Sequence, residues 1–295
     1  MPFHVIKGTM HLVGKTKNGN PSGFEPDGDS IQFKPHDLKK LDLLQRLKSP
    51  YKPSSIKSVN LRLEGIDATE LHVAGSKRQP SPFGENARDF LTGLFGMNPV
   101  TYATPNGIKV KPPANDGKDA YILSRALDVH GRPVSFLFVG KTSETDGKQV
   151  KLDTTRLKKS VNYKLIAEGH AYPLFYDTLF FDLRNALAAA SDKARKANKN
   201  IWKRNVLKAF SVSSTVDAEA AQLLYPKLFR RLVDYFKNHS NLNNFVSWMN
   251  ANHQNDELWT LSDLNHTHLD NVLKVTATTI SLTTQPSKIV FVSRK

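Results

Sequence analysis

The chain carries a strand-like stretch that runs into a cluster of charges, Leu61-Arg62-Leu63-Glu64-Gly65-Ile66-Asp67-Ala68-Thr69-Glu70. Apolar and polar residues alternate in its first half, which is the pattern of a half-buried β-strand. Arg62 lies within this alternation, and Asp67 and Glu70 follow it. A cation and two carboxylates are therefore predicted to gather around the end of one strand.

Two other segments add charged residues of the same kinds. The first, Asp27-Gly28-Asp29-Ser30, precedes the stretch and has the composition of a turn. The second, Asp128-Val129-His130-Gly131-Arg132, joins two segments that are predicted to pair as a hairpin, 120–127 and 133–139. Because Arg132 follows a Gly in a tight turn, we expect its guanidinium to reach back over the sheet. Together, the three segments favour a site that cuts phosphodiesters.

The charged residues match the steps of that reaction. Hydrolysis must neutralise charge on a five-coordinate phosphorus, deliver a water in line and help an alkoxide to leave. Arg62 and Arg132 suit the first step, because a planar guanidinium binds two phosphoryl oxygens and stays charged. Glu70, three residues beyond Asp67, is the candidate to accept the proton of the attacking water.

The remaining carboxylates suit a metal ion. Asp29 and Asp67 are hard oxygen donors that could share one cation, and the backbone carbonyl of Ala68 is a natural third ligand. Such donors favour Ca²⁺ or a similar hard divalent cation and suit zinc poorly. The chain contains no Cys, so cysteine-ligated zinc, iron–sulfur clusters, thiolate catalysis and disulfides are all excluded.

Each of these residues also has an ordinary explanation when it is taken singly. Arg62 could be an outward-facing strand residue, Asp27-Gly28-Asp29 a plain turn, and Glu70 a solvated loop residue. Arg132 could serve solubility, as Arg in hairpin turns often does. What favours the functional interpretation is the conjunction of all of them, in this order and each at a predicted strand end or turn.

The ordered set resembles the staphylococcal nuclease (thermonuclease-like) family, whose pattern is an Asp-Gly-Asp-Thr/Ser turn, a strand Arg followed by Asp and Glu, and a later Gly-Arg. The similarity extends over residues 8–206, with several insertions. Further segments that resemble the family are Phe83-Gly84-Glu85-Asn86-Ala87, Val161-Asn162, Glu168-Gly169-His170-Ala171 and Asn200-Ile201-Trp202.

The resemblance implies a fold and an activity. The fold is an OB-fold five-stranded β-barrel with helical cover, in the α+β class. The activity is calcium-dependent hydrolysis of DNA and RNA with little sequence preference, leaving 3′-phosphate ends. The implied roles are calcium binding by Asp29, Asp67 and the Ala68 carbonyl, phosphoryl binding by Arg62 and Arg132, and general base catalysis by Glu70.

Three positions depart from the family pattern. The usual Lys-Tyr before Gly-Arg is Val129-His130 here, so His130 is the residue left to contact a terminal phosphate. The usual Thr-Pro between the Asp and the Glu is Ala68-Thr69. In the base-stacking segment the first aromatic position falls on Phe175, with Tyr176 next to it, and these two are the candidates for stacking on bases.

The charge of the chain agrees with a polyanionic partner. Its 295 residues carry a net charge of +15, and 33 of the 42 basic residues precede position 207. Lysines and arginines that neutralise phosphates release condensed counterions, so this excess predicts binding to DNA and RNA. No apolar run approaches the ~20 residues that span a bilayer. Residues 1–7 lack the features of a secretory signal, which favours a cytoplasmic protein, or a secreted one from which a signal has been removed.

The chain is predicted to form two domains, 1–206 and 207–295, the second a small α+β domain. Its predicted helices are 216–238 and 241–251, and its predicted strands, 272–282 and 289–292, are joined at Gln285-Pro286-Ser287. The first domain is predicted to contain a strand at 58–66 and helices that begin at Phe83, Asn162 and Asp182.

Two alternatives remain open. OB folds also bind nucleic acid without cutting it, so a non-catalytic nucleic-acid-binding scaffold is the competing function. Clustered carboxylates beside a phosphate argue against it, because a pure binder has no need for them. Residues 207–295 could bind a protein partner or restrain the activity, since an unspecific nuclease inside a cell endangers its host.

Overall fold

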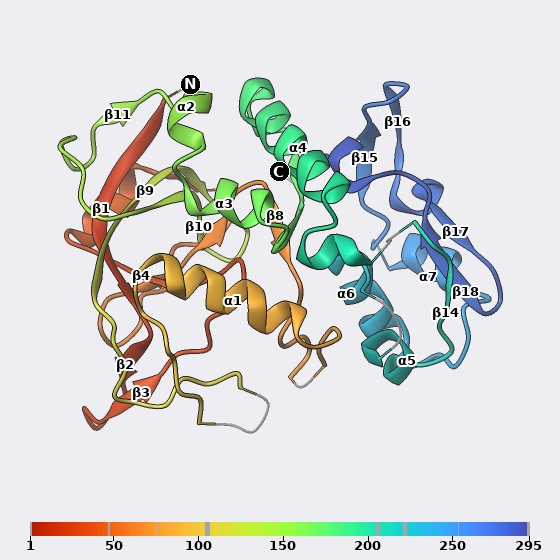
Figure 1. Ribbon diagram of the computed structural model, residues 1–295, viewed down its shortest axis with the longest axis horizontal. Coiled ribbons are helices and arrows are strands. Elements are labelled where there is room, and N and C mark those ends of the chain that lie inside the picture. Colours follow the sequence, from red (N-terminus) through yellow and green to blue (C-terminus); the bar gives the residue numbers. More distant parts are fainter. Residues whose placement is uncertain are drawn as a thin grey trace. The chain divides into compact units, whose positions relative to one another are not determined.

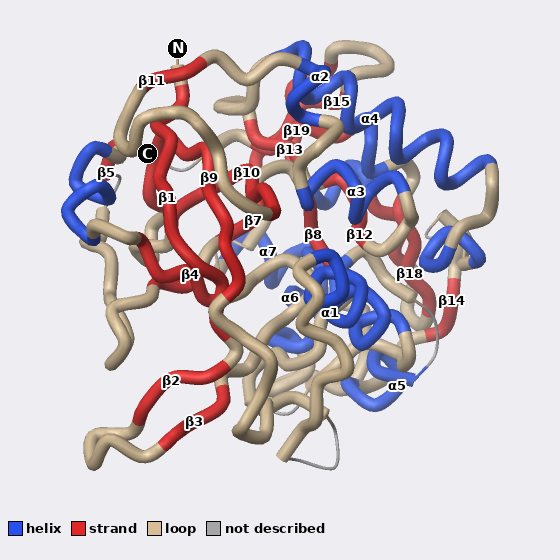
Figure 2. Tube along the Cα trace, turned by 60° about the vertical axis from the view of Figure 1, so that its left-hand side comes forward, coloured by secondary structure: helices blue, strands red, loops and turns tan. Residues whose placement is uncertain are grey.

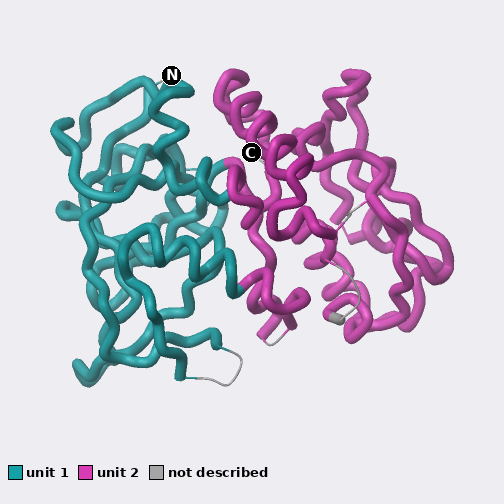
Figure 3. The backbone as a smooth tube through the Cα atoms, in the orientation of Figure 1, with its two compact units in different colours: residues 1–64, 85–165 teal, residues 65–84, 166–295 magenta. Residues whose placement is uncertain are grey.

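The computed structural model describes residues 2–46, 48–75, 77–103, 107–204, 207–220, 223–252 and 254–293 (Figure 1). The chain divides into two compact units, which Figure 3 shows in different colours. The first unit contains residues 1–64 and 85–165, and the second contains 65–84 and 166–295. Within the described ranges, no helix has both the length and the apolar character needed to cross a membrane.

The first unit is built on one sheet that curls back on itself. Its strands follow the path β6-β4-β1-β9-β10-β7, and Figure 2 shows β1, β4 and β9 side by side. The two end strands, β6 (Val59–Asn60) and β7 (Arg62–Leu63), are consecutive in the chain with one residue between them. Because one short segment supplies both ends of the path, the sheet is a nearly closed barrel.

The remaining strands of this sheet are mostly antiparallel. β1 (Phe3–His11) pairs with both β4 (Gln32–Pro35) and β9 (Lys118–Leu127), and β9 pairs with β10 (Pro133–Val139). The pairing of β10 with β7 is parallel. Two short strands that the sequence did not predict, β5 (Gln45–Arg46) and β11 (Gln149–Val150), join β9 and β1, so the sheet contains more than the predicted five strands.

The helices of the first unit lie where local signals place them. α1 (Phe83–Leu94) is followed by Gly96, whose φ of +64° favours a residue without a Cβ. The other elements are β2 (Val13–Lys15), β3 (Pro21–Gly23), η1 (Leu38–Leu43), α2 (Thr154–Leu157) and α3 (Val161–Ala167). α1 and α3 each continue across the division between the units.

A buried asparagine ties α3 to the barrel. The Asn162 side chain accepts a hydrogen bond from the backbone N–H of Leu137 (3.0 Å) and donates to the carbonyls of Glu64 (2.9 Å) and Ser135 (3.0 Å). Asn162 has no exposed surface. These three bonds join the segment after β7 to β10 and fix the backbone immediately beyond Arg62.

A second buried polar group shapes the β9–β10 turn. One oxygen of the Asp128 carboxylate accepts hydrogen bonds from the backbone N–H groups of His130 and Arg132, both at 2.9 Å. Gly131 has a φ of +80°, and a Cβ there would lie 2.0 Å from the Pro50 carbonyl oxygen, so the turn requires glycine. Burial by itself would raise the pKa of Asp128. Arg132 and these N–H groups lower the pKa by more than burial raises it, so the net pKa lies below the ordinary value.

The second unit begins with β8 (Ile66–Ala68), which carries Asp67 and pairs antiparallel with β12 (Ala171–Pro173). Its core gathers large aromatic residues from distant parts of the chain. The Tyr172 ring lies edge-on to Trp202 and Tyr225, with centroids 5.1 Å and 5.9 Å away. Residues before and after position 207 thus share one hydrophobic core.

The second unit contains more short strands than the sequence indicated. Its helices are α4 (Phe181–Lys196), η2 (Asn200–Lys203), α5 (Thr215–Ala220), α6 (Pro226–Tyr235), α7 (Phe245–Ala251), η3 (Leu269–Val272) and η4 (Pro286–Lys288). Its other strands are β13 (Phe175–Tyr176), β14 (Phe210–Ser211), β15 (Glu257–Thr260), β16 (Asn265–His268), β17 (Leu273–Val275), β18 (Thr279–Leu282) and β19 (Ile289–Phe291).

One expectation for this part of the chain was wrong in detail, because the predicted strand 272–282 is a hairpin of β17 and β18. The strand predicted at 289–292 is β19, which pairs with β13 and β15. The compact units also divide the chain at other positions than the predicted boundary, and Val206 lies outside the described residues. The division into domains 1–206 and 207–295 therefore stays a prediction.

Replacing Asn162 with Ala should destabilise the protein by about 2–4 kcal/mol, because it removes three hydrogen bonds, two of them buried, and leaves the buried N–H of Leu137 without its partner. Urea unfolding measures this change. The exposed Lys159, in the turn before α3, provides a matched control. Lys159→Ala should change the free energy of unfolding by less than about 0.5 kcal/mol. Equal effects of the two substitutions would contradict the structural role of Asn162.

Replacing Asp128 with Asn should lower the free energy of unfolding by about 2–3 kcal/mol at pH 7, because hydrogen bonds to a buried charge are lost. Since the folded pKa lies below the ordinary 3.8, the stabilisation is fully present above that value and is lost as pH falls through the folded pKa.

The difference between wild type and Asp128→Asn should therefore narrow in urea unfolding curves as pH is lowered from 7 to about 2. The control is Asp42→Asn, which breaks an exposed pair with Arg46 and should cost at most about 0.5 kcal/mol. A difference between wild type and Asp128→Asn that is the same at every pH would show that the charge of Asp128 is not what stabilises the turn.

Candidate functional site

The two arginines predicted to bind phosphate lie beside one carboxylate in the first unit. Arg132 Nη2 lies 2.8 Å from Asp128 Oδ2, and Arg62 Nη1 lies 3.9 Å from the same oxygen. Asp128 is only 5% exposed, whereas about a third of each arginine side chain remains exposed. The carboxylate holds two guanidinium groups together and neutralises one of their two charges.

A further carboxyl group, that of Glu64, interacts electrostatically with Arg62. Burial raises the pKa of Glu64, and the guanidinium groups of Arg62 and Arg125 oppose that rise. With Arg132 and Asp128, this part of the first unit contains three arginines and two acidic groups. The excess of cationic side chains around Arg62 is what binding of a phosphodiester anion requires.

Two other predicted residues also belong to the first unit. The Asp29 carbonyl accepts a hydrogen bond from the backbone N–H of Leu63 at 3.1 Å, so the predicted turn lies beside β7. In the same turn, Asp27 is buried and its carboxylate accepts from the N–H of Gly28 at 2.8 Å. His130 is exposed in the β9–β10 turn.

The two carboxylates predicted to serve as ligand and base belong to the second unit. Asp67 lies in the middle of β8, opposite Tyr172 of β12, and Ala68 lies opposite Ala171. Glu70 follows two residues later. The side chains of Asp67 and Glu70 are 4% and 13% exposed. Two carboxylates with so little exposed surface require a cation nearby.

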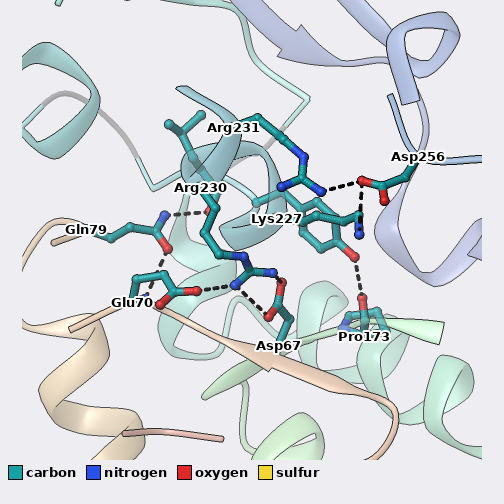
Figure 4. A network of polar contacts seen from close by, with 10 residues as sticks. Asp67, Glu70, Gln79, Pro173, Lys227, Arg230, Arg231 and Asp256 are labelled. Carbon is teal, nitrogen blue, oxygen red and sulfur yellow. Dashed lines mark hydrogen bonds and ion pairs between the residues drawn. The ribbon is translucent and has the colours of Figure 1, made fainter. Parts of the chain in front are cut away.

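Arg230 of α6 supplies that cation (Figure 4). Its Nη1 and Nη2 donate to the two carboxylate oxygens of Asp67, each at 3.1 Å, and Nη1 also donates to Glu70 Oε1. Partial burial lowers the pKa of the guanidinium, but the charges of Asp67 and Glu70 raise it more, so the net pKa lies well above the ordinary value. One side chain thus engages both the predicted metal ligand, Asp67, and the predicted base, Glu70.

The segment that carries Glu70 is joined to the region before α6. The Gln79 side chain accepts from the N–H of Glu70 at 3.2 Å and donates to the Leu224 carbonyl at 2.9 Å. Lys77 pairs with Glu219 at 3.0 Å. The Tyr225 hydroxyl donates to the Pro173 carbonyl, on the strand that pairs with β8, at 3.1 Å. Contacts from Glu219, Leu224 and Tyr225 therefore hold the residues around the Asp67–Glu70 segment at several points.

The other basic residues of α6 have a different partner. Lys227 Nζ and Arg231 Nη2 both pair with Asp256 Oδ2, at 3.2 Å and 2.7 Å. The two are four residues apart and therefore share one face of the helix. Burial by itself would raise the pKa of Asp256. Lys227 and Arg231 lower the pKa by more than burial raises it, so the net pKa lies below the ordinary value.

The implied metal does not fit the second unit as it stands. Asp67 and Glu70 have the hard oxygen donors that a cation such as Ca²⁺ prefers. Both oxygens of Asp67 and one of Glu70 already accept hydrogen bonds from Arg230, and a divalent cation on the same oxygens would meet a guanidinium of like charge. Among the described residues, no group of three or more His, Asp or Glu side chains is arranged to hold a metal ion.

The candidate stacking residues have different environments. Phe175 is fully buried, so a base could stack on it only after a rearrangement. Tyr176 is partly exposed, and its ring centroid lies 5.7 Å from Lys227 Nζ. Two further histidines, His266 and His268, are in β16, where His266 stacks on the partly exposed Trp259.

Sequence reasoning missed three residues of the site. Asp128 begins the segment 128–132 and received no predicted role. Its position at the start of a turn was nevertheless a signal, because an Asp side chain there can bond to the backbone two residues further on. Gln79 carries no signal of its own. Arg230 lies in the run Lys227-Leu228-Phe229-Arg230-Arg231, where the two arginines look alike and nothing local distinguishes the one that contacts Asp67.

Comparisons with known proteins agree with the sequence resemblance. A family model described as staphylococcal nuclease homologue matches residues 60–204, a range that includes Arg62, Asp67, Glu70 and Arg132 but not Asp29. A search of the curated proteins found no match. The matched family implies an OB fold and nuclease-type hydrolysis of phosphodiesters. Residues 60–204 of this chain are therefore a domain of the staphylococcal nuclease homologue family.

Proposed function

We propose that the protein hydrolyses phosphodiester bonds in DNA and RNA with little sequence preference and leaves 3′-phosphate ends. The observation that carries the proposal is the convergence of Arg62 and Arg132 on Asp128, within 3.9 Å and 2.8 Å. Two partly exposed guanidinium groups held together in this way can bind the oxygens of one phosphoryl group, where charge develops in the transition state.

The proposed reaction assigns one task to each group. Arg62 and Arg132 bind the phosphoryl oxygens and stabilise the charge of the five-coordinate phosphorus. Glu70 accepts a proton from the attacking water as its oxygen bonds to phosphorus. The bond from phosphorus to the 5′ oxygen breaks, the leaving oxygen takes a proton from solvent water, and the products are a 3′-phosphate and a 5′-hydroxyl. Asp29, Asp67 and the Ala68 carbonyl are the residues that the family resemblance implies for Ca²⁺ or a similar hard cation.

Contacts outside the reacting atoms are part of the same proposal. His130 is exposed in the β9–β10 turn, and its proposed role is to contact a terminal phosphate of the substrate. Tyr176, and Phe175 once exposed, are the residues proposed to stack on bases. The net charge of +15 supports binding of both DNA and RNA through the phosphate backbone.

One observation favours a second function, that of a non-catalytic nucleic-acid-binding scaffold. The hydrogen bond from Arg230 to Glu70 holds the proposed base in an ion pair, and a paired carboxylate is a weaker proton acceptor. A protein that kept this pair permanently would bind nucleic acid through its arginines without cutting it.

Cleavage of plasmid DNA and of RNA should fall at least about 100-fold in Glu70→Gln and in Arg62→Ala, because the first removes the base and the second a phosphoryl ligand. Gel assays with purified full chain measure the rates. Glu168→Gln and Arg46→Ala are the matched controls, since both residues are largely exposed and pair elsewhere, with Lys199 and Asp42. Cleavage at the wild-type rate by Glu70→Gln would contradict its role as base.

Cleavage should also require a divalent cation. We expect that EDTA abolishes it and that Ca²⁺ restores it better than Mg²⁺, since Asp and backbone carbonyl ligands in flexible geometry suit the larger ion. The same substrates, assayed with each metal in turn, test this. Tight binding without cleavage in every metal would instead favour the scaffold.

A further inference from the structure

Arg230 makes the same kind of contact to Asp67 and Glu70 that a bound cation would make. Its guanidinium contacts three carboxylate oxygens, both of Asp67 and one of Glu70 (Figure 4). Charge-assisted bonds of this geometry are among the strongest polar contacts in proteins. Because they engage both Asp67 oxygens, a metal ion on that carboxylate would meet the like charge of the guanidinium at close range, which disfavours its binding.

The two neighbouring basic residues of α6 have a different partner, which distinguishes Arg230 from them. Lys227 and Arg231, on the same helix, pair with Asp256, and Arg231 also donates to the Gln254 carbonyl at 3.0 Å. The three cations of α6 are thus divided, with two at Asp256 and one between Asp67 and Glu70. Loss of Arg230 would leave two poorly exposed carboxylates with one cation fewer, which favours binding of an external cation.

The anchoring of α6 indicates which part can move. Gln79 and Tyr225 hold the start of the helix to the Glu70 segment and to β12, through bonds of 2.9–3.2 Å. The Arg230 side chain, in contrast, is 30% exposed. A change of its rotamer would release both carboxylates and return the guanidinium to water, while the helix and the aromatic core stay in place.

We infer that Arg230 and a divalent cation compete for the Asp67–Glu70 carboxylates, so that Arg230 acts as a built-in brake on the activity. The brake rests on the proposed hydrolysis, whereas the competition does not. With Arg230 in contact, the charge of the guanidinium disfavours metal binding at the carboxylates, and Glu70 is held in an ion pair. With Arg230 displaced, Asp67 can bind a cation and Glu70 can accept a proton.

The competition should raise the apparent Kd for Ca²⁺ by a measurable factor. When only a fraction of molecules is open to a ligand, its apparent Kd exceeds the intrinsic value by the inverse of that fraction. If Arg230 leaves the site open in about a tenth of molecules or fewer, the apparent Kd for Ca²⁺ is about tenfold or more above the intrinsic value. Removing the guanidinium should therefore lower the apparent Kd for Ca²⁺ by about the same factor.

The test compares full-length wild type, Arg230→Gln and Arg231→Gln by calorimetric titration with Ca²⁺ alone. Arg230→Gln should bind with a Kd at least about tenfold lower than wild type. Arg231→Gln is the matched control, because it removes the adjacent arginine, whose partner is Asp256, and should bind like wild type. Adding Asp67→Asn to Arg230→Gln should abolish the gain if Ca²⁺ binds at Asp67.

Stability provides a second measurement in case Arg230→Gln folds poorly. A ligand that binds only the folded state raises the melting temperature. Ca²⁺ should therefore raise Tm more in Arg230→Gln than in wild type, and should restore folding if the variant is unfolded without it. Equal Kd values in wild type and Arg230→Gln, or equal calcium-induced shifts in Tm, would overturn the competition.

Cleavage assays separate the brake from the function. At Ca²⁺ concentrations below the wild-type Kd, Arg230→Gln should cut plasmid DNA faster than wild type, and Arg231→Gln should not. Tighter calcium binding by Arg230→Gln without faster cutting would overturn the brake. If neither wild type nor Arg230→Gln cleaves in any metal, the proposed hydrolysis fails, and the Ca²⁺ titration still decides whether the competition exists.

Discussion

Two carboxylates with little exposed surface must have a cation beside them, and this requirement at Asp67 and Glu70 organises the second unit. Water cannot stabilise their charges well at 4% and 13% exposure. Arg230 meets the requirement from a helix 160 residues further along the chain. The residues that fix its helix, Gln79 and Tyr225, are in turn buried and fully bonded to the segments that they join.

This requirement also explains why residues after position 207 are integrated with the matched family domain. They contribute Tyr225, Phe245 and Phe291 to a core that also contains Tyr172 and Trp202. A helix that must place one guanidinium against Asp67 needs a rigid support, and a shared aromatic core provides it. The region is therefore part of the fold around β8, and its influence on the site follows from that position.

In the first unit it is the cationic side chains that need a group of opposite charge. Arg62 and Arg132 would repel each other if nothing lay between them, and Asp128 holds both while leaving one net positive charge. The same carboxylate closes the β9–β10 turn, so one buried group positions both the backbone and the cations. A phosphate ligand can then bind to guanidinium groups whose geometry is already set.

Local patterns in the sequence were sufficient to predict much of the first unit. The hairpin around His130-Gly131-Arg132 and the starts of the helices at Phe83 and Asn162 follow from alternation, turn residues and helix signals, which act between neighbours in the chain. The single strand predicted at 58–66 is instead divided among β6, β7 and the first residue of β8. The family resemblance rests on the same kind of local motif, and the family model matches residues 60–204.

Only the tertiary structure decided which distant groups meet. Nothing in the sequence around Arg230 distinguishes it from Arg231, yet one pairs with Asp67 and the other with Asp256. The sequence did not indicate the partners of β19 for the same reason, since a short apolar strand can pair with any suitable edge. The sequence by itself determined the residue types of a phosphodiesterase-like site and its local elements. Whether the carboxylates of that site lie open or bound to an arginine depends on long-range packing, because the pairing of buried charges is settled by the three-dimensional arrangement of the whole core.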